Sequence, residues 1–360
     1  MTNFANTPIK GRGAVSRPGV RFDAWSREAD GDHRDYAAQH EDAAPLRTEL
    51  NIDPARSIIS YNQSPDIPFD RSINPYKGCE HGCIYCYARP THAYLGLSPG
   101  LDFESKIFYK ADAANLLRKE LSKPNYRAAL LSLGANTDPY QPAERKLGIT
   151  RAILEVLNEF NHPVAIVTKS ASVERDIDIL GDMAQRNLSR VFLSIGTLDH
   201  DISRHLEPRT SAPARRMQAV RALSSAGIPT GVMVAPVIPA LTDKDIEAVL
   251  EAAKENGAES AAYILLRLPL EVKTLFAEWL QQHFPQRAHH VMSLIRQMRD
   301  GKDYVADFNT RMVGTGNFAE LIRKRFTIAA KRLGLSAERP PLDATQFKVP
   351  PGANAQLSLF

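Results

Sequence analysis

From about residue 70 onward, short runs rich in β-branched residues alternate with stretches of helical periodicity, and this alternation restricts the fold more than any other feature. The strand candidates share a length of five or six residues: 72–76, 129–133, 163–168, 190–195, 230–235 and 261–266. The helical candidates follow them: 112–121, 143–158, 172–186, 212–226, 243–255 and 272–283. Strands that alternate with helices form parallel βα units. The chain is therefore expected to form either a barrel or an open doubly wound sheet.

The polar residues of the alternating region favour the barrel. No G-x-G-x-x-G follows the first strand, so a dinucleotide-binding sheet has no specific support. In β/α barrels the functional side chains gather at the carboxyl ends of the strands. Polar residues follow four of the predicted strands in this way: Cys79 onward, Asn136-Thr137-Asp138, Lys169-Ser170 and Gly196-Thr197. We expect a site at that end.

The regions that flank the alternating part differ from it in composition. Residues 1–60 carry no sustained period and are expected to be an extended or disordered segment, with a basic start that is interpreted as a solvated tail or a nucleic-acid arm. Residues 287–339 hold eleven Lys and Arg against five Asp and Glu and are predicted to form a basic helical extension. Residues 340–360 contain four prolines and are expected to be a flexible tail. The barrel itself is expected to span residues 65–286.

One amphipathic helix is expected within the basic extension. Its apolar face comprises Leu321, Ile322, Phe326, Ala329, Ala330 and Leu333, and Gly334 ends it. Arg323, Lys324, Lys331 and Arg332 lie off that face, where they meet either solvent or a phosphate backbone.

Composition excludes several classes of protein. With 43% hydrophobic and 24% charged residues in 360, the chain is not wholly disordered, and its net charge of +4 does not by itself indicate nucleic acid. It has no run of about 18 apolar residues that could span a membrane. The N-terminus lacks the apolar segment of a secretory signal, so a cytoplasmic location is expected.

All three cysteines of the chain, Cys79, Cys83 and Cys86, lie within eight positions. An odd number so closely packed is a poor disulfide framework. Three thiolates on one short loop can hold three corners of a [4Fe–4S] cluster and leave the fourth iron open to substrate. Gly78 and Gly82 permit the tight wrapping that such a loop needs.

Two alternatives use the same cysteines. A structural zinc ion needs four ligands, and without a second cysteine pair the fourth would be His81 or His92. A redox pair would use Cys83 and Cys86 and leave Cys79 unexplained.

The spacing C-x3-C-x2-C, with Tyr85 directly before the third cysteine, resembles the signature of the radical S-adenosylmethionine (SAM) superfamily. The resemblance implies a partial (β/α)6 TIM-like barrel and an enzyme whose open iron binds the methionine part of SAM. It implies that one electron from the cluster cleaves SAM reductively to a 5′-deoxyadenosyl radical. It also implies an electron donor such as a flavodoxin or ferredoxin.

Segments across roughly residues 70–270 are similar to the spore photoproduct lyase branch and its uncharacterised bacterial relatives. These segments are Val167-Thr168-Lys169, Leu193-Ser194-Ile195, Leu206-Glu207-Pro208 and Val234-Ala235-Pro236, joined near the N-terminus by Lys10-Gly11-Arg12-Gly13-Ala14. The resemblance implies that SAM is contacted by Tyr85, Asn136, Thr137, Asp138, Lys169, Ser194, Arg216 and Ala235. Lys169 and Arg216 would supply positive charge for the methionine carboxylate. Ser194 and Asn136 would bond the ribose or the amino end.

The chain lacks the cysteine that serves that branch as hydrogen donor to the product radical. Photoproduct lyases carry a further cysteine just before the polar-Asp turn, where this chain has Ala135. Thymine-dimer reversal by that route is therefore not expected, and Tyr140 or Tyr263 is left as an alternative residue to quench a radical. The usual Gly-Gly-Glu after the second strand is also replaced, by Thr137-Asp138.

The last five residues, Gln356-Leu357-Ser358-Leu359-Phe360, resemble the pentapeptide that binds the bacterial sliding clamp. Gln356, Leu357, Leu359 and Phe360 are expected to make that contact. Together with the basic extension and the lyase resemblance, this motif favours damaged or modified DNA as the substrate. The alternatives are a clamp-associated DNA-repair adaptor with a structural cluster and an RNA-modifying radical enzyme.

Overall fold

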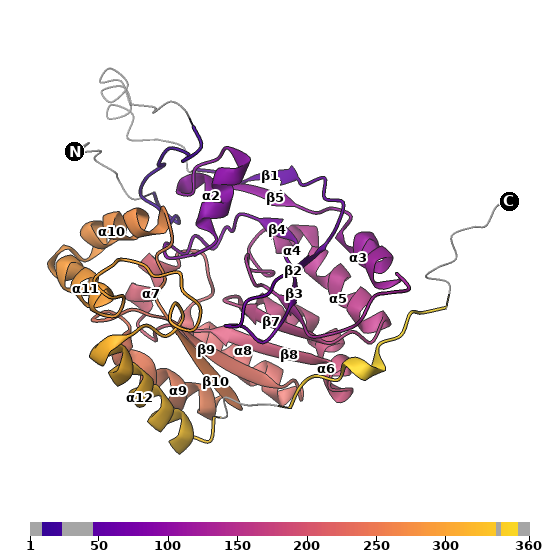
Figure 1. Ribbon diagram of the computed structural model, residues 1–360. Helices are drawn as coiled ribbons and strands as arrows, with labels where there is room; N and C mark the ends of the chain where they lie inside the picture. The colour runs from indigo at the N-terminus through magenta and orange to yellow at the C-terminus, as the bar shows by residue number, and fades with distance from the viewer. Residues whose placement is uncertain (1–8, 24–45, 336–339, 352–360) are drawn as a thin grey trace.

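The computed structural model describes residues 9–23, 46–335 and 340–351 (Figure 1). A seven-stranded sheet with the order β10-β9-β8-β7-β6-β3-β2 lies at its centre. The strands are β2 (Ile59–Tyr61), β3 (Arg71–Ile73), β6 (Leu131–Leu133), β7 (Val164–Thr168), β8 (Ser189–Ser194), β9 (Thr230–Val237) and β10 (Ser260–Leu265). Neighbours from β3 to β10 are parallel, and β2 runs antiparallel to β3. The six predicted strands are all present, and the expected partial (β/α)6 barrel is confirmed.

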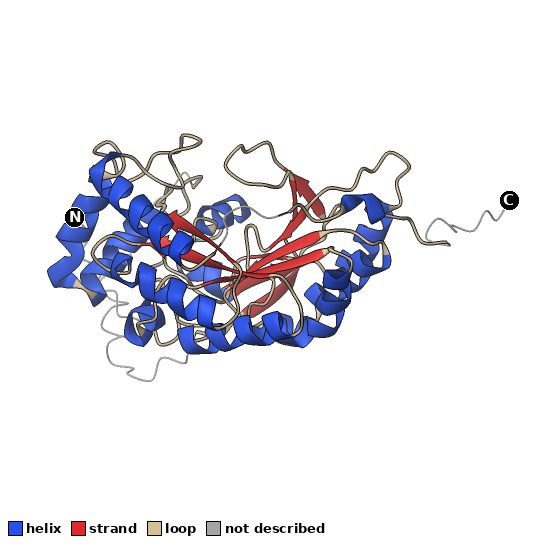
Figure 2. Cartoon of the chain, turned by 90° about the horizontal axis from the view of Figure 1, so that it is seen from below, coloured by secondary structure: helices blue, strands red, loops and turns tan. Residues whose placement is uncertain are grey.

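Most helices line one side of this sheet, which is the lower side in Figure 2. The α-helices that follow β5 (Lys106–Tyr109) are α3 (Ala113–Leu121), α4 (Glu144–Leu147), α5 (Ile149–Glu159), α6 (Ile177–Gln185), α7 (His200–Leu206), α8 (Pro213–Ser225), α9 (Ile246–Glu255), α10 (Val272–His283), α11 (Pro285–Gln297) and α12 (Gly316–Arg332). Strand residues such as Ile166 and Val191 share one buried cluster with helix residues such as Leu154 and Leu250. None of the helices in the described part of the chain combines the length and apolar character that a membrane span needs.

Three of the predicted helices begin or continue differently in the structure. The stretch 143–158 forms two helices, α4 and α5, because Gly148 between them adopts a left-handed conformation with φ of 64°. The stretch 172–186 starts with the 3-10 turn η2 (Ala171–Asp176) before α6 begins. The stretch 243–255 likewise starts with a 3-10 turn, η3 (Asp243–Asp245), before α9 begins.

A small second sheet, with the order β1-β5-β4, was not predicted. It consists of β1 (Glu49–Ile52), β5 (Lys106–Tyr109) and β4 (Tyr76–Lys77). Strands of two to four residues are too short to show a period in the sequence. The short helix α2 (Leu101–Ser105) and the 3-10 helix η1 (Arg89–Leu95) lie between β4 and β5 along the chain. These elements surround the loop that carries the cysteines.

The predicted amphipathic helix is α12. The prediction that Leu321 lies on its apolar face is wrong. Ile322, Phe326, Ala329 and Ala330 are buried, but the side chain of Leu321 is 49% exposed. Successive residues point about 100° apart around a helix, so the burial of Ile322 turns Leu321 away from the core.

The basic side of α12 meets another helix as well as solvent. Arg325 and Arg332 of α12 form ion pairs with Glu247 and Glu251 of α9. These two cations therefore stabilise the packing of the extension on the barrel.

Both terminal segments pack on the barrel where the structure describes them. The prediction of a solvated tail is wrong for residues 12–15, which are buried, while Phe22 further along is 58% exposed. The prediction of a flexible tail is wrong for residues 340–348, because the Phe347 ring packs against Phe160, with 6.2 Å between their centroids. The short turn η4 (Ala344–Gln346) leads into that contact. The predicted domain boundaries stay predictions.

Candidate functional site

The cysteine loop follows β4, which comes directly after β3 at one end of the parallel sheet. Its two glycines adopt left-handed conformations, with φ of 79° at Gly78 and 69° at Gly82. A Cβ atom on Gly78 would lie 2.9 Å from the carbonyl oxygen of Phe103. The Cys79 amide donates to that same oxygen at 2.9 Å, which fixes the start of the loop.

The three thiols share one low-dielectric environment. Cys79 and Cys83 are buried, Cys86 is half-buried, and Cys79 and Cys86 belong to an apolar cluster with Phe103. Burial raises the pKa of the Cys83 thiol, and negative charge on Cys79 and Cys86 raises it further, while Lys169 opposes the rise. Mutual repulsion of this kind means that a positively charged group must accompany the three thiolates.

The donor set fits a cluster better than a single ion. Within the described ranges, no three His, Cys, Asp or Glu side chains converge closely enough to hold one metal ion. A [4Fe–4S] cubane takes each thiolate on a separate iron, so it does not require convergence on one point. Three thiols that influence one another without converging match that requirement.

Each of the two histidines named as a fourth zinc ligand contacts another group through one ring nitrogen. A ring nitrogen of His92 lies 3.0 Å from the Lys106 carbonyl oxygen, and burial lowers its pKa to about 4. His81 Nδ1 lies 3.3 Å from an Asp138 carboxylate oxygen. Burial alone would lower the pKa of His81, but Asp138 and Cys79 raise it to about 10. The described residues therefore assemble no four-ligand zinc set.

Asp138 organises the loops after β6 and β7. Its carboxylate accepts hydrogen bonds from the Thr168 hydroxyl and the Lys169 amide, both at 2.7 Å, and from the Tyr140 amide at 2.9 Å. Burial alone would raise the pKa of Asp138, but His81 and these donors lower it to about 2. The structure thus places Asp138 as a brace between the cysteine loop and the sheet.

Four of the predicted cofactor-binding residues come together beside the cysteine loop. Lys169, after β7, donates from Nζ to the Ser194 hydroxyl at the end of β8, at 2.8 Å. Ser194 donates in turn to the Ala235 carbonyl oxygen in β9, at 3.0 Å. The Lys169 ammonium also lies 5.8 Å from the centroid of the Tyr85 ring. An ammonium group with three protons can satisfy Ser194 and still bind a carboxylate.

Arg216 is 1% exposed, and its donors are already engaged within the protein. It donates to the carbonyl oxygens of Ser194 and Ser211 at 2.6 and 2.7 Å and forms a buried ion pair with Glu207. Direct contact between Arg216 and a methionine carboxylate, which the sequence suggested, would require one of these bonds to break. The structure instead places Arg216 as a positioning residue behind the site.

Glu207 is a site residue that sequence reasoning missed. Its carboxylate accepts from the Tyr85 hydroxyl as well as from Arg216. Burial alone would raise the pKa of Glu207, but Arg216 and Lys169 hold it below its usual range. The segment Leu206-Glu207-Pro208 carries the signal that could have identified it.

The residues after β6 lie at the rim of the same end of the sheet. The Asn136 amide donates to Asn74 Oδ1 at 2.9 Å, and the buried Thr137 hydroxyl donates to the Tyr76 carbonyl oxygen at 3.1 Å. Tyr87, which directly follows Cys86, donates its hydroxyl hydrogen bond to the Ala135 carbonyl oxygen. Tyr87 was not singled out in the sequence, because its contact with Ala135 spans 48 positions.

The two tyrosines that were named as alternatives have side chains that contact other parts of the protein. The Tyr140 hydroxyl donates to Asp176 at 3.0 Å, and the Tyr263 ring packs against Phe326 of α12.

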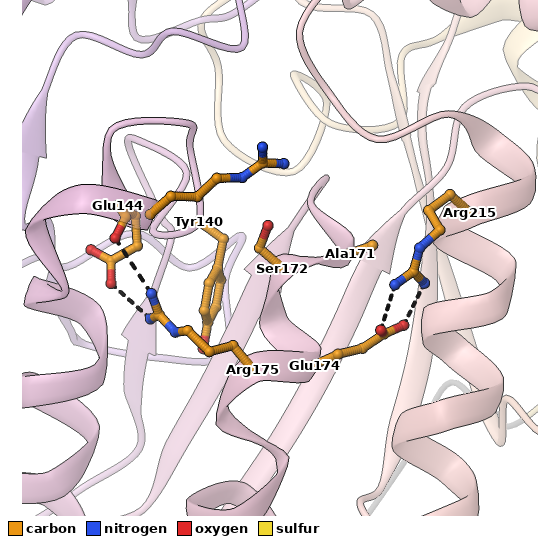
Figure 3. Close-up of a pocket in the computed structure, with 8 residues that line it drawn as sticks. Tyr140, Glu144, Ala171, Ser172, Glu174, Arg175 and Arg215 are labelled. Atoms are coloured by element: carbon orange, nitrogen blue, oxygen red, sulfur yellow. Dashed lines mark hydrogen bonds and ion pairs between the residues drawn. The ribbon is translucent and has the colours of Figure 1, made fainter.

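A cavity of about 390 Å³ lies beside the site rather than at the cysteine loop. Its lining is shown in Figure 3: Tyr140, Glu144, Arg145, Ala171, Ser172, Glu174, Arg175 and Arg215. Arg175 pairs with Glu144 at one side of it, and Arg215 pairs with Glu174 at the other. None of its lining residues belongs to the cysteine loop, so its size does not make it the reaction site. Gln356, Leu357, Leu359 and Phe360, the predicted clamp contacts, lie outside the described residues.

Comparison with known proteins adds a family and a fold. The model of the radical SAM superfamily matches residues 73–253. An uncharacterised protein of Mycobacterium tuberculosis is 35% identical over 233 residues, which cover 64% of this chain and 68% of that protein. An uncharacterised protein of Methanocaldococcus jannaschii is 26% identical over 214 residues, covering 59% of this chain and 76% of that protein.

Solved structures of spore photoproduct lyase share the fold. The lyase complexed with dinucleoside spore photoproduct matches with a TM-score of 0.58 at 17% identity, over 79% of this chain and 80% of that chain. A lyase variant with bound AdoMet and dinucleoside spore photoproduct matches over the same shares, with a TM-score of 0.53 at 16% identity. At such identity the likeness shows the fold alone.

Proposed function

Because the chain belongs to the radical SAM superfamily, we propose that it is an enzyme that holds a [4Fe–4S] cluster on Cys79, Cys83 and Cys86 and cleaves SAM reductively. The proposal rests on one observation: Tyr85 of the cysteine loop lies beside Lys169, which is hydrogen-bonded to Ser194 at the carboxyl ends of β7 and β8. When bound, the cluster supplies the single electron that cleaves SAM to a 5′-deoxyadenosyl radical.

The chain's own residues bind and orient the cofactor in this proposal. The Lys169 ammonium, held by Ser194, offers its remaining protons to the methionine carboxylate. Glu207, held by Arg216, accepts a hydrogen bond from the Tyr85 hydroxyl and so fixes the Tyr85 ring beside Lys169. Asp138 fixes the backbone at Lys169, so the ammonium starts from a rigid strand end.

We propose damaged or modified DNA as the substrate class. The structural relative is complexed with a dinucleoside, and the rim of this site carries two aromatic rings beside arginines. Tyr87, 43% exposed, lies 4.9 Å from the Arg267 guanidinium, and Phe308, 51% exposed, lies 4.6 Å from that of Arg311. Exposed rings can stack on a base while the Arg267 guanidinium contacts phosphate, whereas the Arg311 guanidinium is already paired with Asp66.

The decisive experiment is anaerobic. The full chain is reconstituted with iron and sulfide, reduced, mixed with SAM and assayed for 5′-deoxyadenosine, with and without ultraviolet-irradiated DNA. We expect product from the wild type and none from Cys83→Ala. Lys169→Met should raise the KM for SAM without changing iron content, and Lys146→Met, at an exposed position, serves as its control. A wild type that holds the cluster but forms no 5′-deoxyadenosine under either condition overturns the proposal.

The substrate is tested separately with irradiated DNA, undamaged DNA and RNA of equal length. Turnover stimulated by irradiated DNA alone supports the proposed class, and stimulation by RNA alone contradicts it. The clamp contact of residues 356–360 is proposed from the sequence motif, and deleting those five residues should abolish binding to a purified clamp without changing SAM cleavage.

A further inference from the structure

Residues 9–18, which we call the strap, form neither helix nor strand, yet part of the strap is buried against the barrel. Ala14 is 0% exposed, and its neighbour Arg12 is 8% exposed. The amides of Gly13 and Ala14 donate to the two carboxylate oxygens of Glu104, at 2.9 and 2.8 Å. Glu104 lies in α2 and is itself fully buried.

The same carboxylate reaches the cysteine loop through Arg89. Glu104 and Arg89 form an ion pair in which both side chains are 0% exposed. The Arg89 guanidinium donates to the carbonyl oxygens of Gly82 and Cys83, at 3.0 and 2.9 Å. One buried carboxylate therefore connects the strap to the backbone of the loop.

Gly13 also touches the loop directly. A Cβ atom at Gly13 would lie 1.9 Å from the Gly82 carbonyl oxygen and 3.4 Å from the Ile84 amide nitrogen. The φ of Gly13 is not positive, so the position requires space rather than left-handed freedom. No side chain fits between the strap and the cysteine loop at this point.

Arg12 begins a second chain of hydrogen bonds from the strap to the cysteine loop. It donates to the Glu104 carbonyl oxygen at 2.6 Å and to the Thr48 hydroxyl at 3.2 Å. Thr48 donates in turn to the carboxylate of Glu80, the residue next to Cys79, at 2.6 Å.

The far end of the strap is anchored on α10. The Ser16 hydroxyl donates to Glu278 at 2.6 Å, and beyond the strap Arg21 pairs with Glu271 at 2.7 Å.

We propose that the strap is a positioning element of the cluster site. It holds the backbone of Gly82 and Cys83 from outside the loop, so that the three thiols keep the spacing that the cluster requires. The inference rests on the proposed function, because it concerns the same cysteine loop. Groups that orient metal ligands in this way typically change affinity by about 10–100-fold when they are lost.

The test compares Gly13→Ala with Gly19→Ala in the full reconstituted chain. Gly19 is the matched control, because a Cβ atom there would meet nothing within 4 Å. Release of iron to a chelator is timed without SAM, and the electron paramagnetic resonance spectrum of the reduced cluster is recorded. We expect Gly13→Ala to lose iron about tenfold faster, with a changed spectrum, and Gly19→Ala to match the wild type.

Three results would overturn the inference: wild-type iron release in Gly13→Ala, an unchanged spectrum, or an equal effect in Gly19→Ala. If Gly13→Ala does not fold, Arg12→Lys replaces it, and wild-type iron release there counts against the strap. None of these readouts requires SAM cleavage. A wild type that retains iron but yields no 5′-deoxyadenosine therefore contradicts the proposed function and leaves the strap testable.

Discussion

Two buried arginine–glutamate pairs hold the cysteine loop, and they do so through different atoms. Arg89 and Glu104 bind the main chain: the carbonyl oxygens of Gly82 and Cys83 and the amides of the strap. Arg216 and Glu207 instead bind the Tyr85 hydroxyl and the end of β8. The first pair fixes the shape of the loop, and the second fixes the orientation of one ring within the site.

The difference matters because burial makes both pairs sensitive to the loss of one partner. Removing one member of a buried pair leaves an uncompensated charge, which typically costs about 3–5 kcal/mol. Loss of shape should affect retention of the cluster, whereas loss of orientation should affect binding of SAM. The following experiments test that division.

The largest effect is expected from Glu104→Ala. The substitution leaves the Arg89 guanidinium and two strap amides unpaired, so the free energy of unfolding should fall by about 3–5 kcal/mol. Chemical denaturation of the cluster-free protein measures it. Glu159→Ala, which breaks the half-exposed pair with Arg118, should cost no more than about 1 kcal/mol. Equal losses in the two variants would contradict a special role for the buried pair.

Acid should destabilise the protein through a third buried group that belongs to neither pair. His162 accepts a hydrogen bond from the Tyr126 hydroxyl, and burial lowers its pKa to about 4. A lowered histidine pKa favours the neutral form, so its stabilisation is complete above pH 6.5 and is lost as the pH falls toward 4. The loss should reach up to about 3 kcal/mol.

Denaturation at stepped pH values measures this loss. His162→Gln should remove that part of the pH dependence, while substitution of His290, exposed on α11, should retain it. An unchanged slope in His162→Gln would assign the acid sensitivity to other groups.

Replacing the glutamate of each pair by glutamine compares the roles of the two pairs most directly. Glu104→Gln should release iron about tenfold faster and leave the KM for SAM unchanged. Glu207→Gln should raise that KM about tenfold and release iron at the wild-type rate. Iron release and initial rates are measured on the same preparations. If both variants change iron release and the KM for SAM alike, the two pairs do not have separate roles.

The smallest effect is expected from Tyr85→Phe. It removes one hydrogen bond to Glu207 and keeps the ring, so it should cost about 1 kcal/mol in unfolding free energy. Tyr61→Phe is the matched control, because it removes the hydroxyl of a side chain in β2 that is 63% exposed. A null result at Tyr85 would mean that the ring alone sets its position.

The barrel could be predicted because its strands are long enough for the sequence to show which residues are buried. β7 alternates buried and half-buried residues from Val164 to Thr168, and the buried face of α5 recurs at helical spacing. The cysteine motif was equally accessible, because all its ligands lie in one loop. Local patterns of this kind need no knowledge of the fold.

What escaped prediction depends on contacts between distant segments. Glu104 meets the strap across 91 positions, and Glu207 meets Tyr85 across 122. No periodicity links such residues, and an isolated glutamate is ordinarily a surface residue. Phe347 was overlooked for the same reason, since proline-rich surroundings concealed its contact with Phe160. The framework of the site was visible in the sequence, but Glu104 and Glu207, which brace it, were not.

The anchoring of the strap on α10 also bears on the order in which the protein folds. Ser16 and Glu278 are separated by 262 positions, and contacts of such separation are among the last to form. A ribosome must complete α10 before the strap can be held at both ends. We therefore expect the loop to accept iron only after synthesis has passed that helix, so that cofactor loading is a late step.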